Sequence, residues 1–289
     1  MGKSVYFARL VLGVIVACLA LLFIQLLRNS ALPRQGFYEL FRYLAWEENR
    51  IKTHNFKSLE TNHFVIKFLD EDERFTSLVA KTAEDVYDPI TGFFNFRPAD
   101  KIVIVMYPDG ESLARSFGWD KDERAMGVYW GGTIRILSPR AWTSDAYVES
   151  TFTRDGPIAH EFTHLLVDYM TRGNYSRWFT EGVAQYVEKK TTGFSFGDPF
   201  AGTGAGDRRK RIYDFTTLER EFDQLDQGIA YWESLQAVEY MVKLGGEPGL
   251  LKVIEALREG NSMPRAVEKG LGVSFAAFTD NFYVQVLDN

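Results

Sequence analysis

The sequence is poor in cysteine and histidine, and it has no excess of positive charge. Its 289 residues include one cysteine and four histidines, and the formal net charge is -6. A lone Cys18 excludes an intrachain disulfide framework and any Cys₄ or Cys₂His₂ zinc site. A nucleic-acid-binding protein is also disfavoured, because phosphates are neutralised by a basic face. Any bound metal must therefore be held by histidine and carboxylate side chains.

The N-terminal region contains one long apolar stretch, Leu10 to Leu27, in which Gln25 is the only polar side chain. As a helix it would be about 27 Å long, close to the roughly 30 Å hydrocarbon core of a bilayer. It is longer than the apolar part of a cleavable signal peptide, and no A-x-A cleavage site follows it. We therefore predict an uncleaved signal-anchor rather than a cleaved signal. Residues 1–29 would form a short cytoplasmic tail and one transmembrane helix, with the rest of the chain outside the cytoplasm.

Residues 30–58 form a predicted juxtamembrane connector. Phe37, Leu40, Phe41 and Leu44 recur there at helical spacing. This spacing predicts an amphipathic helix that lies near the bilayer or against the next domain. Packing against protein is the commoner outcome for such a stripe, and we expect it here.

The remaining chain changes its periodicity near residue 155, which indicates an α+β protein. Residues 59–154 form a predicted N-terminal lobe with a mixed sheet, and residues 155–289 a helical lobe. Strands are expected at 63–68 and 102–107, followed by a hairpin, 127–130 and 133–137, around Gly131-Gly132. Helices are expected at 75–87, 158–171, 178–190, 230–244, 248–259 and 274–286.

The strongest motif is His160-Glu161-Phe162-Thr163-His164, or H-E-x-x-H. Residues four apart on a helix lie one turn above one another, so both imidazoles can bind one Zn²⁺. Glu161 is rotated by about 100° from His160, where it can polarise a water on the metal. Asp155-Gly156-Pro157 before the motif is typical of a helix start.

A catalytic zinc usually takes three protein ligands and keeps one open position. Glu181, in the first turn of the next predicted helix, is the expected third ligand, and Glu188 is the competing candidate. The small residues Gly182 and Ala184 would let the two helices approach closely. The sequence thus predicts a zinc site formed by His160, His164 and Glu181.

Residues 192–206 form a glycine-rich segment followed by a basic run, 208–211. A phosphate-binding loop is one interpretation of the glycines, and it would make the chain a nucleotide-binding protein. No strand precedes the segment and no Lys-Ser/Thr closes it, so we favour a mobile surface loop.

HEFTH followed by WFTEGVAQY resembles the gluzincin metallopeptidases, and the closest resemblance is to their peptidase MA-like family. HFVIKF, KIVIVMYP, GVYWGGTIRILSP and AYWESLQAVEYMVKLGG also look like segments of that family, so the similarity covers roughly residues 60–285. The resemblance implies a gluzincin fold with zinc in the cleft between a sheet-bearing lobe and a helical lobe. It implies peptide-bond hydrolysis with Glu161 as the general base.

The resemblance also implies further roles around the metal. Tyr231 would donate to the developing oxyanion, with Tyr186 as the alternative, and strand 133–137 would form the upper edge of the cleft. HEFTHLLVDYMTRG also resembles the active-site helix of thermolysin, whose relatives carry a histidine-orienting Asp where this chain has Gln185. Asp168 is then a candidate for orienting an imidazole. We expect a membrane-anchored zinc peptidase acting on peptides or proteins; the alternative is a catalytically silent gluzincin-fold scaffold.

Overall fold

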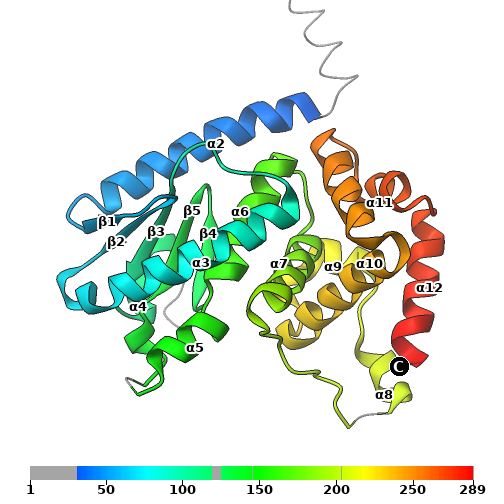
Figure 1. Cartoon of the computed structure of the whole chain (residues 1–289). Coiled ribbons are helices and arrows are strands. Elements are labelled where there is room, and N and C mark those ends of the chain that lie inside the picture. Colours follow the sequence, from blue (N-terminus) through cyan, green and yellow to red (C-terminus); the bar gives the residue numbers. More distant parts are fainter. Residues whose placement is uncertain (1–30, 119–124, 145, 203, 289) are drawn as a thin grey trace, which may run out of the picture.

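A computed structural model of the protein describes residues 31–288, apart from 119–124, 145 and 203 (Figure 1). The predicted signal-anchor lies outside the described residues. Among the helices of the described part, none combines the length and apolar character that a membrane crossing requires. The architecture is α+β: strands and helices alternate up to Leu137, and described elements after that point are helical. The predicted fold class is thus confirmed at this level.

The sheet has five strands in the spatial order β1-β2-β3-β5-β4. The strands are β1 (Lys57–Glu60), β2 (Phe64–Phe68), β3 (Ile102–Tyr107), β4 (Gly127–Trp130) and β5 (Thr133–Leu137). The three central strands are parallel, and β1 and β4 pair antiparallel at the two edges. The predicted hairpin is confirmed, but β4 is its edge strand, so our placing of 133–137 at the edge was wrong.

Strand β3 has apolar side chains on both faces because both faces are covered. Ile102, Ile104 and Met106 belong to the main core, whereas Val105 and Tyr107 belong to a smaller cluster with Leu113. Helices α3 (Thr76–Phe94) and α6 (Ile158–Thr171) pack on the main-core side, and α4 (Gly110–Phe117) packs on the other. The uninterrupted apolar run of this strand predicted that both of its faces would be covered.

The helical half continues from α5 to α12. Its further helices are α5 (Val148–Asp155), α7 (Arg177–Thr192), α8 (Ala205–Arg211), α9 (Phe215–Glu221), α10 (Gln227–Arg258), α11 (Met263–Leu271) and α12 (Phe275–Asp288). The two helices expected at 230–244 and 248–259 form α10 and meet at Gly246, whose φ of 65° interrupts the helix. Short 3-10 turns occupy Asp70–Phe75, Pro139–Ala141 and Phe222–Gln224.

Helix α2 (Ala31–Lys52) runs along one side of the molecule, at the top of Figure 1. Near its start the Tyr38 hydroxyl donates to Asp168 of α6, and near its end the Lys52 ammonium donates to the Ser116 carbonyl, 2.9 Å away. The helix is confirmed, but its expected packing stripe is exposed. From residue 36 onward, where side-chain burial is described, Tyr38, Ala45 and Asn49 are the buried residues of α2 instead.

Candidate metal centre

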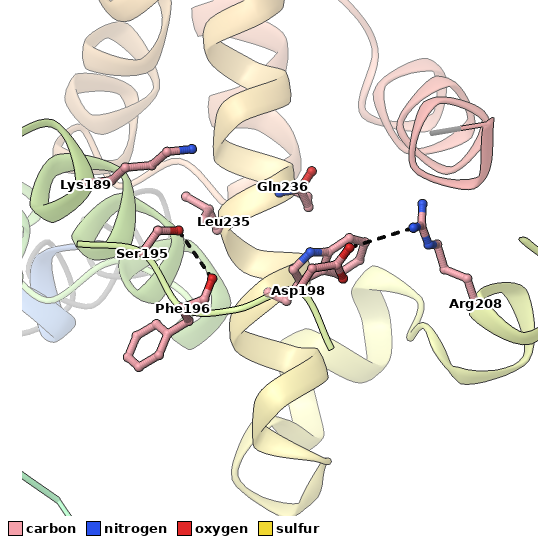
Figure 2. A pocket seen from close by; sticks show the side chains of 8 residues that line it. Lys189, Ser195, Phe196, Asp198, Arg208, Leu235 and Gln236 are labelled. Atoms are coloured by element: carbon pink, nitrogen blue, oxygen red, sulfur yellow. Dashed lines mark hydrogen bonds and ion pairs between the residues drawn. The ribbon is translucent and has the colours of Figure 1, made fainter. Parts of the chain in front are cut away.

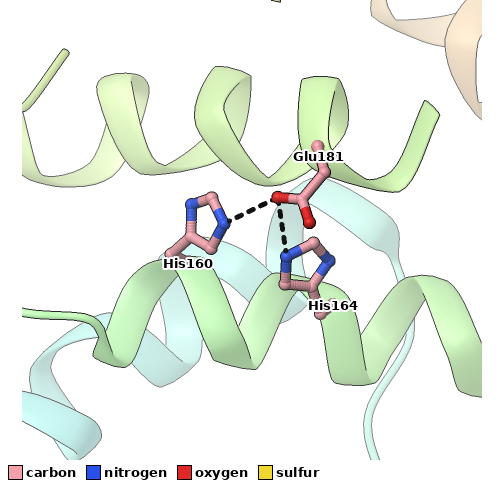
Figure 3. A group of neighbouring side chains, drawn as sticks. All are labelled: His160, His164 and Glu181. Atoms are coloured by element: carbon pink, nitrogen blue, oxygen red, sulfur yellow. Dashed lines mark hydrogen bonds and ion pairs between the residues drawn. The ribbon is translucent and has the colours of Figure 1, made fainter. Parts of the chain in front are cut away.

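Helices α6 and α7 bring His160, His164 and Glu181 together (Figure 3). The Oε2 atom of Glu181 lies 3.2 Å from Nε2 of His160 and 3.3 Å from Nε2 of His164. The three ligand atoms all lie within 4.8 Å of one another, and the group is buried. This group could hold a metal ion.

Two of the distances within the group match those around a tetrahedral ion. Two ligand atoms that each lie 2.0–2.1 Å from a tetrahedral zinc are about 3.3 Å apart. The spacing between Glu181 Oε2 and each imidazole nitrogen is therefore close to one edge of such a tetrahedron.

Each imidazole is oriented through its other nitrogen. Nδ1 of His160 lies 3.1 Å from Oε2 of Glu188, and Nδ1 of His164 lies 2.7 Å from Oγ1 of Thr180. When Nδ1 donates to these oxygens, each Nε2 presents a lone pair towards Glu181. In that tautomer the two lone pairs and the carboxylate oxygen converge where a metal ion could bind, whereas without an ion a proton on His160 can bridge to Glu181.

The residues that orient the histidines differ from those expected. Glu188, weighed as the competing ligand, contacts the outer nitrogen of His160. Asp168 accepts hydrogen bonds from Tyr38 and Tyr129 instead of contacting an imidazole. The Gln185 amide donates to the Tyr231 carbonyl, 2.8 Å away, and ties α7 to α10. The prediction that Asp168 orients an imidazole was therefore wrong. The carboxylate that contacts an imidazole nitrogen is that of Glu188.

Gly182, next to the predicted third ligand Glu181, allows a different helix–helix contact from the one expected. A Cβ on Gly182 would lie 2.2 Å from the Ser234 carbonyl oxygen and 2.7 Å from Val238 Cγ2. Gly182 therefore permits α7 to approach α10, not α6. This contact fixes the helix that presents Glu181.

The buried charges of the group stabilise one another. Burial alone would raise the pKa of Glu181, but His164 and His160 hold it well below its ordinary value. Burial alone would lower the pKa of His160, but hydrogen bonds with Glu181 and Glu188 raise it well above its ordinary value. Burial raises the pKa of Glu161, against the opposing effect of both histidines. A raised pKa is typical of a carboxylate that accepts a proton during catalysis.

Glu161 is held against the edge strand of the sheet. Its Oε2 accepts a hydrogen bond from the backbone N–H of Tyr129, 2.6 Å away. A Cβ on Gly127 would lie 2.5 Å from Pro157 Cβ and 2.9 Å from Glu161 Cγ, so β4 can approach α6 this closely only with glycine there. The general-base candidate is thus positioned by a main-chain donor.

Tyr231 lies next to the metal group, whereas Tyr186 does not contact it. Arg177 hydrogen-bonds the Tyr231 side chain, and its Nε donates to Glu181 Oε1, 2.8 Å away. Burial, and next the charge of Glu181, raise the pKa of Tyr231, so its hydroxyl keeps its proton at neutral pH. The Tyr186 hydroxyl is 2.9 Å from Glu247 instead.

The glycine-rich segment forms one wall of a pocket of about 300 Å³ against α10 (Figure 2). Lys189 and Arg208 line it, but Lys189 pairs with Glu239 at 2.8 Å and Arg208 lies 4.0 Å from Asp198. The basic side chains of the pocket are therefore already next to carboxylates, which does not favour the phosphate-binding interpretation. The Phe196 ring lies 6.3 Å from that of Tyr231, so this wall adjoins the metal group.

The sequence matches no protein-family model and, at a significant level, no curated protein. Interpretation of the site therefore depends on its geometry and on the motif.

Proposed function

We propose that the protein is a zinc-dependent metallopeptidase with a gluzincin-like fold. The observation that carries the proposal is the convergence of His160, His164 and Glu181, with the separately held carboxylate of Glu161 one residue from the first ligand. His₂Glu with one open position is a donor set that zinc hydrolases use. When bound, zinc supplies a Lewis acid for the attack of water on a peptide carbonyl.

The chain's own residues divide the remaining work. Glu161 takes the proton of the attacking water and delivers it to the leaving amine. The neutral Tyr231 hydroxyl donates a hydrogen bond to the developing oxyanion. Arg177 holds Oε1 of Glu181, which leaves Oε2 directed at the two imidazoles. An extended peptide or protein substrate would bind along β4, the edge strand next to Glu161.

We further propose that the chain is a single-pass membrane protein anchored by the apolar stretch 10–27, with the metal-binding part outside the cytoplasm. Two independent observations support this attachment: the length of the stretch and its charged flanks in the sequence. No nucleic-acid partner is proposed, since the chain carries a net negative charge.

The test compares the wild type with Glu161→Gln and with the matched control Glu149→Gln on the exposed start of α5. Wild type and control should bind stoichiometric zinc and cleave members of a peptide library in a chelator-sensitive way. Glu161→Gln should keep its zinc and lose hydrolysis, because only the base is changed. A zinc-loaded wild type without hydrolysis would favour the silent scaffold, and full activity in Glu161→Gln would remove Glu161 as the base.

A further inference from the structure

Helix α2 has two faces, and the more apolar one points away from the protein. Phe37, Leu40, Leu44 and Ile51 have exposed fractions of 72%, 53%, 56% and 65%. At 100° per residue these four side chains fall within an arc of about 60°. We call this set the outer face of α2.

The opposite side of α2 makes the protein contacts. Tyr38, Ala45 and Asn49 are at most 9% exposed and lie within an arc of about 40°, centred roughly 130° from the outer face. Arg42 lies beside them and stacks on the Tyr169 ring of α6, with 3.7 Å from its guanidinium carbon to the ring centroid. The helix therefore cannot turn its outer face inward without breaking these contacts.

The outer face belongs to a concentrated patch. Seven of the thirteen large hydrophobic side chains exposed in the described part of the chain lie on α2, and four of these seven form the outer face. Scattered apolar side chains are ordinary on a protein surface, but a continuous set marks an interaction site. Glu48 lies about 20° outside this arc, and it pairs with Lys52 at 2.6 Å.

We propose that the outer face of α2 lies on the surface of a phospholipid bilayer. The argument comes from where the undescribed chain joins the helix: the apolar stretch ends at Leu27 and α2 begins at Ala31. Four residues span at most about 14 Å, so a membrane-spanning 10–27 segment would hold the start of α2 at the bilayer.

This arrangement would fix the metal group near the membrane. Tyr38 on the inner side of α2 bonds Asp168, and His164 and His160 lie one and two turns back along α6. The distance along α6 from Asp168 to His160 is about 12 Å. The proposal rests on the membrane attachment proposed above, and it adds that a second, interfacial element sets the orientation of the folded part.

The test uses the full chain in vesicles of phosphatidylcholine and phosphatidylglycerol. Single cysteines replace Leu40 or Leu44 on the outer face in a Cys18→Ser background, and the matched controls replace the exposed residues Glu39 or Arg50 of the same helix. Spin labels at positions 40 and 44 should be relaxed more by oxygen, which concentrates in lipid, than by a water-soluble nickel complex. Labels at positions 39 and 50 should show the reverse.

Two results would overturn the proposal. Water exposure at all four positions would show that the outer face is not on lipid. Protection from both relaxants, with spectral broadening that disappears on dilution with unlabelled protein, would show that a second copy covers it. A label on Cys18 in the otherwise native chain reports the anchor independently, so failure of the anchor is distinguished from failure of the α2 contact.

Discussion

Replacing Glu188 tests how the metal group is organised, because this carboxylate touches a histidine and not the ion position. Its Oε2 lies 3.1 Å from Nδ1 of His160, and its side chain is buried. Glu188→Gln keeps the size and an acceptor oxygen but removes the charge that favours the donor form of Nδ1. Loss of such an outer partner typically costs 10–100-fold in metal affinity. We therefore expect zinc to bind about 10–100-fold more weakly, equivalent to about 1.4–2.8 kcal/mol.

Competition between the protein and a chromophoric chelator measures this change. Glu239→Gln is the matched control, because Glu239 pairs with Lys189 on the surface and its loss should leave zinc affinity unchanged. Glu181→Gln provides the other reference, since a ligand is lost. If Glu188→Gln bound zinc as tightly as the wild type, the orienting role would be refuted. If it lost zinc as completely as Glu181→Gln, Glu188 would be a ligand, contrary to the geometry.

Three further changes test other parts of the structure. Gly182→Ala should lower the free energy of unfolding by about 3 kcal/mol in urea titrations, because its Cβ would meet the α10 backbone. Gly92→Ala, on an open helix surface, is the control and should not destabilise the protein. Equal effects of the two substitutions would contradict the close contact at Gly182. Burial raises the pKa of Glu233 from 4.5 to about 8, so the folded state keeps a proton that the unfolded chain releases, and stability should fall as pH rises across that window by about 5 kcal/mol. Glu233→Gln should remove this fall, and an unchanged pH profile would count against it. Tyr231→Phe should keep zinc and lower kcat by about 10²–10³, with little change in KM; unchanged kcat would exclude the oxyanion role.

Those parts of the fold that depend on a local sequence pattern, such as an apolar run or a turn signal, were predictable from the sequence. β3 has an uninterrupted apolar run because layers cover both faces, and Gly131-Gly132 marks the hairpin because both residues have positive φ, 52° and 96°. The order of β4 and β5 in the sheet depends on parallel pairing between β3 and β5, which no local pattern records. The edge strand was misassigned for that reason.

Helix α2 shows a second limit of periodicity. The spacing of Phe37, Leu40 and Leu44 correctly predicts a helix with an apolar side, but it does not state which side meets the protein. The packed side is chosen by specific polar contacts, such as Tyr38 with Asp168, and by the close approach of Ala45 to Gly131, where an added Cβ would lie 2.4 Å from Ala45 Cβ. Such contacts depend on partners more than eighty residues away in the sequence.

At the metal group, the three proposed ligands come together as expected because their spacing is set within two helices. The residues that orient them were missed or assigned to other roles. Thr180 and Glu188 lie on α7 at one residue before and seven residues after Glu181, which places them on the same side of that helix. That spacing can be taken from the sequence. Only the packing of α7 on α6 shows that Thr180 reaches Nδ1 of His164 and Glu188 reaches Nδ1 of His160.

Helix α6 is positioned by several elements at once, and Tyr129 of β4 contributes at two points. Its backbone N–H donates to Glu161, and its hydroxyl donates to Asp168, 2.5 Å away and nearly two turns further along α6. The hydroxyl also accepts the Gly132 N–H at 3.0 Å, which ties the hairpin turn to the same residue. Because one edge strand fixes both Glu161 and the far end of the helix, α6 cannot slide or rotate without breaking a bond to Glu161. The position of the proposed base, Glu161, relative to the two imidazoles is therefore set by the sheet, whereas the direction of the imidazoles is set by α7.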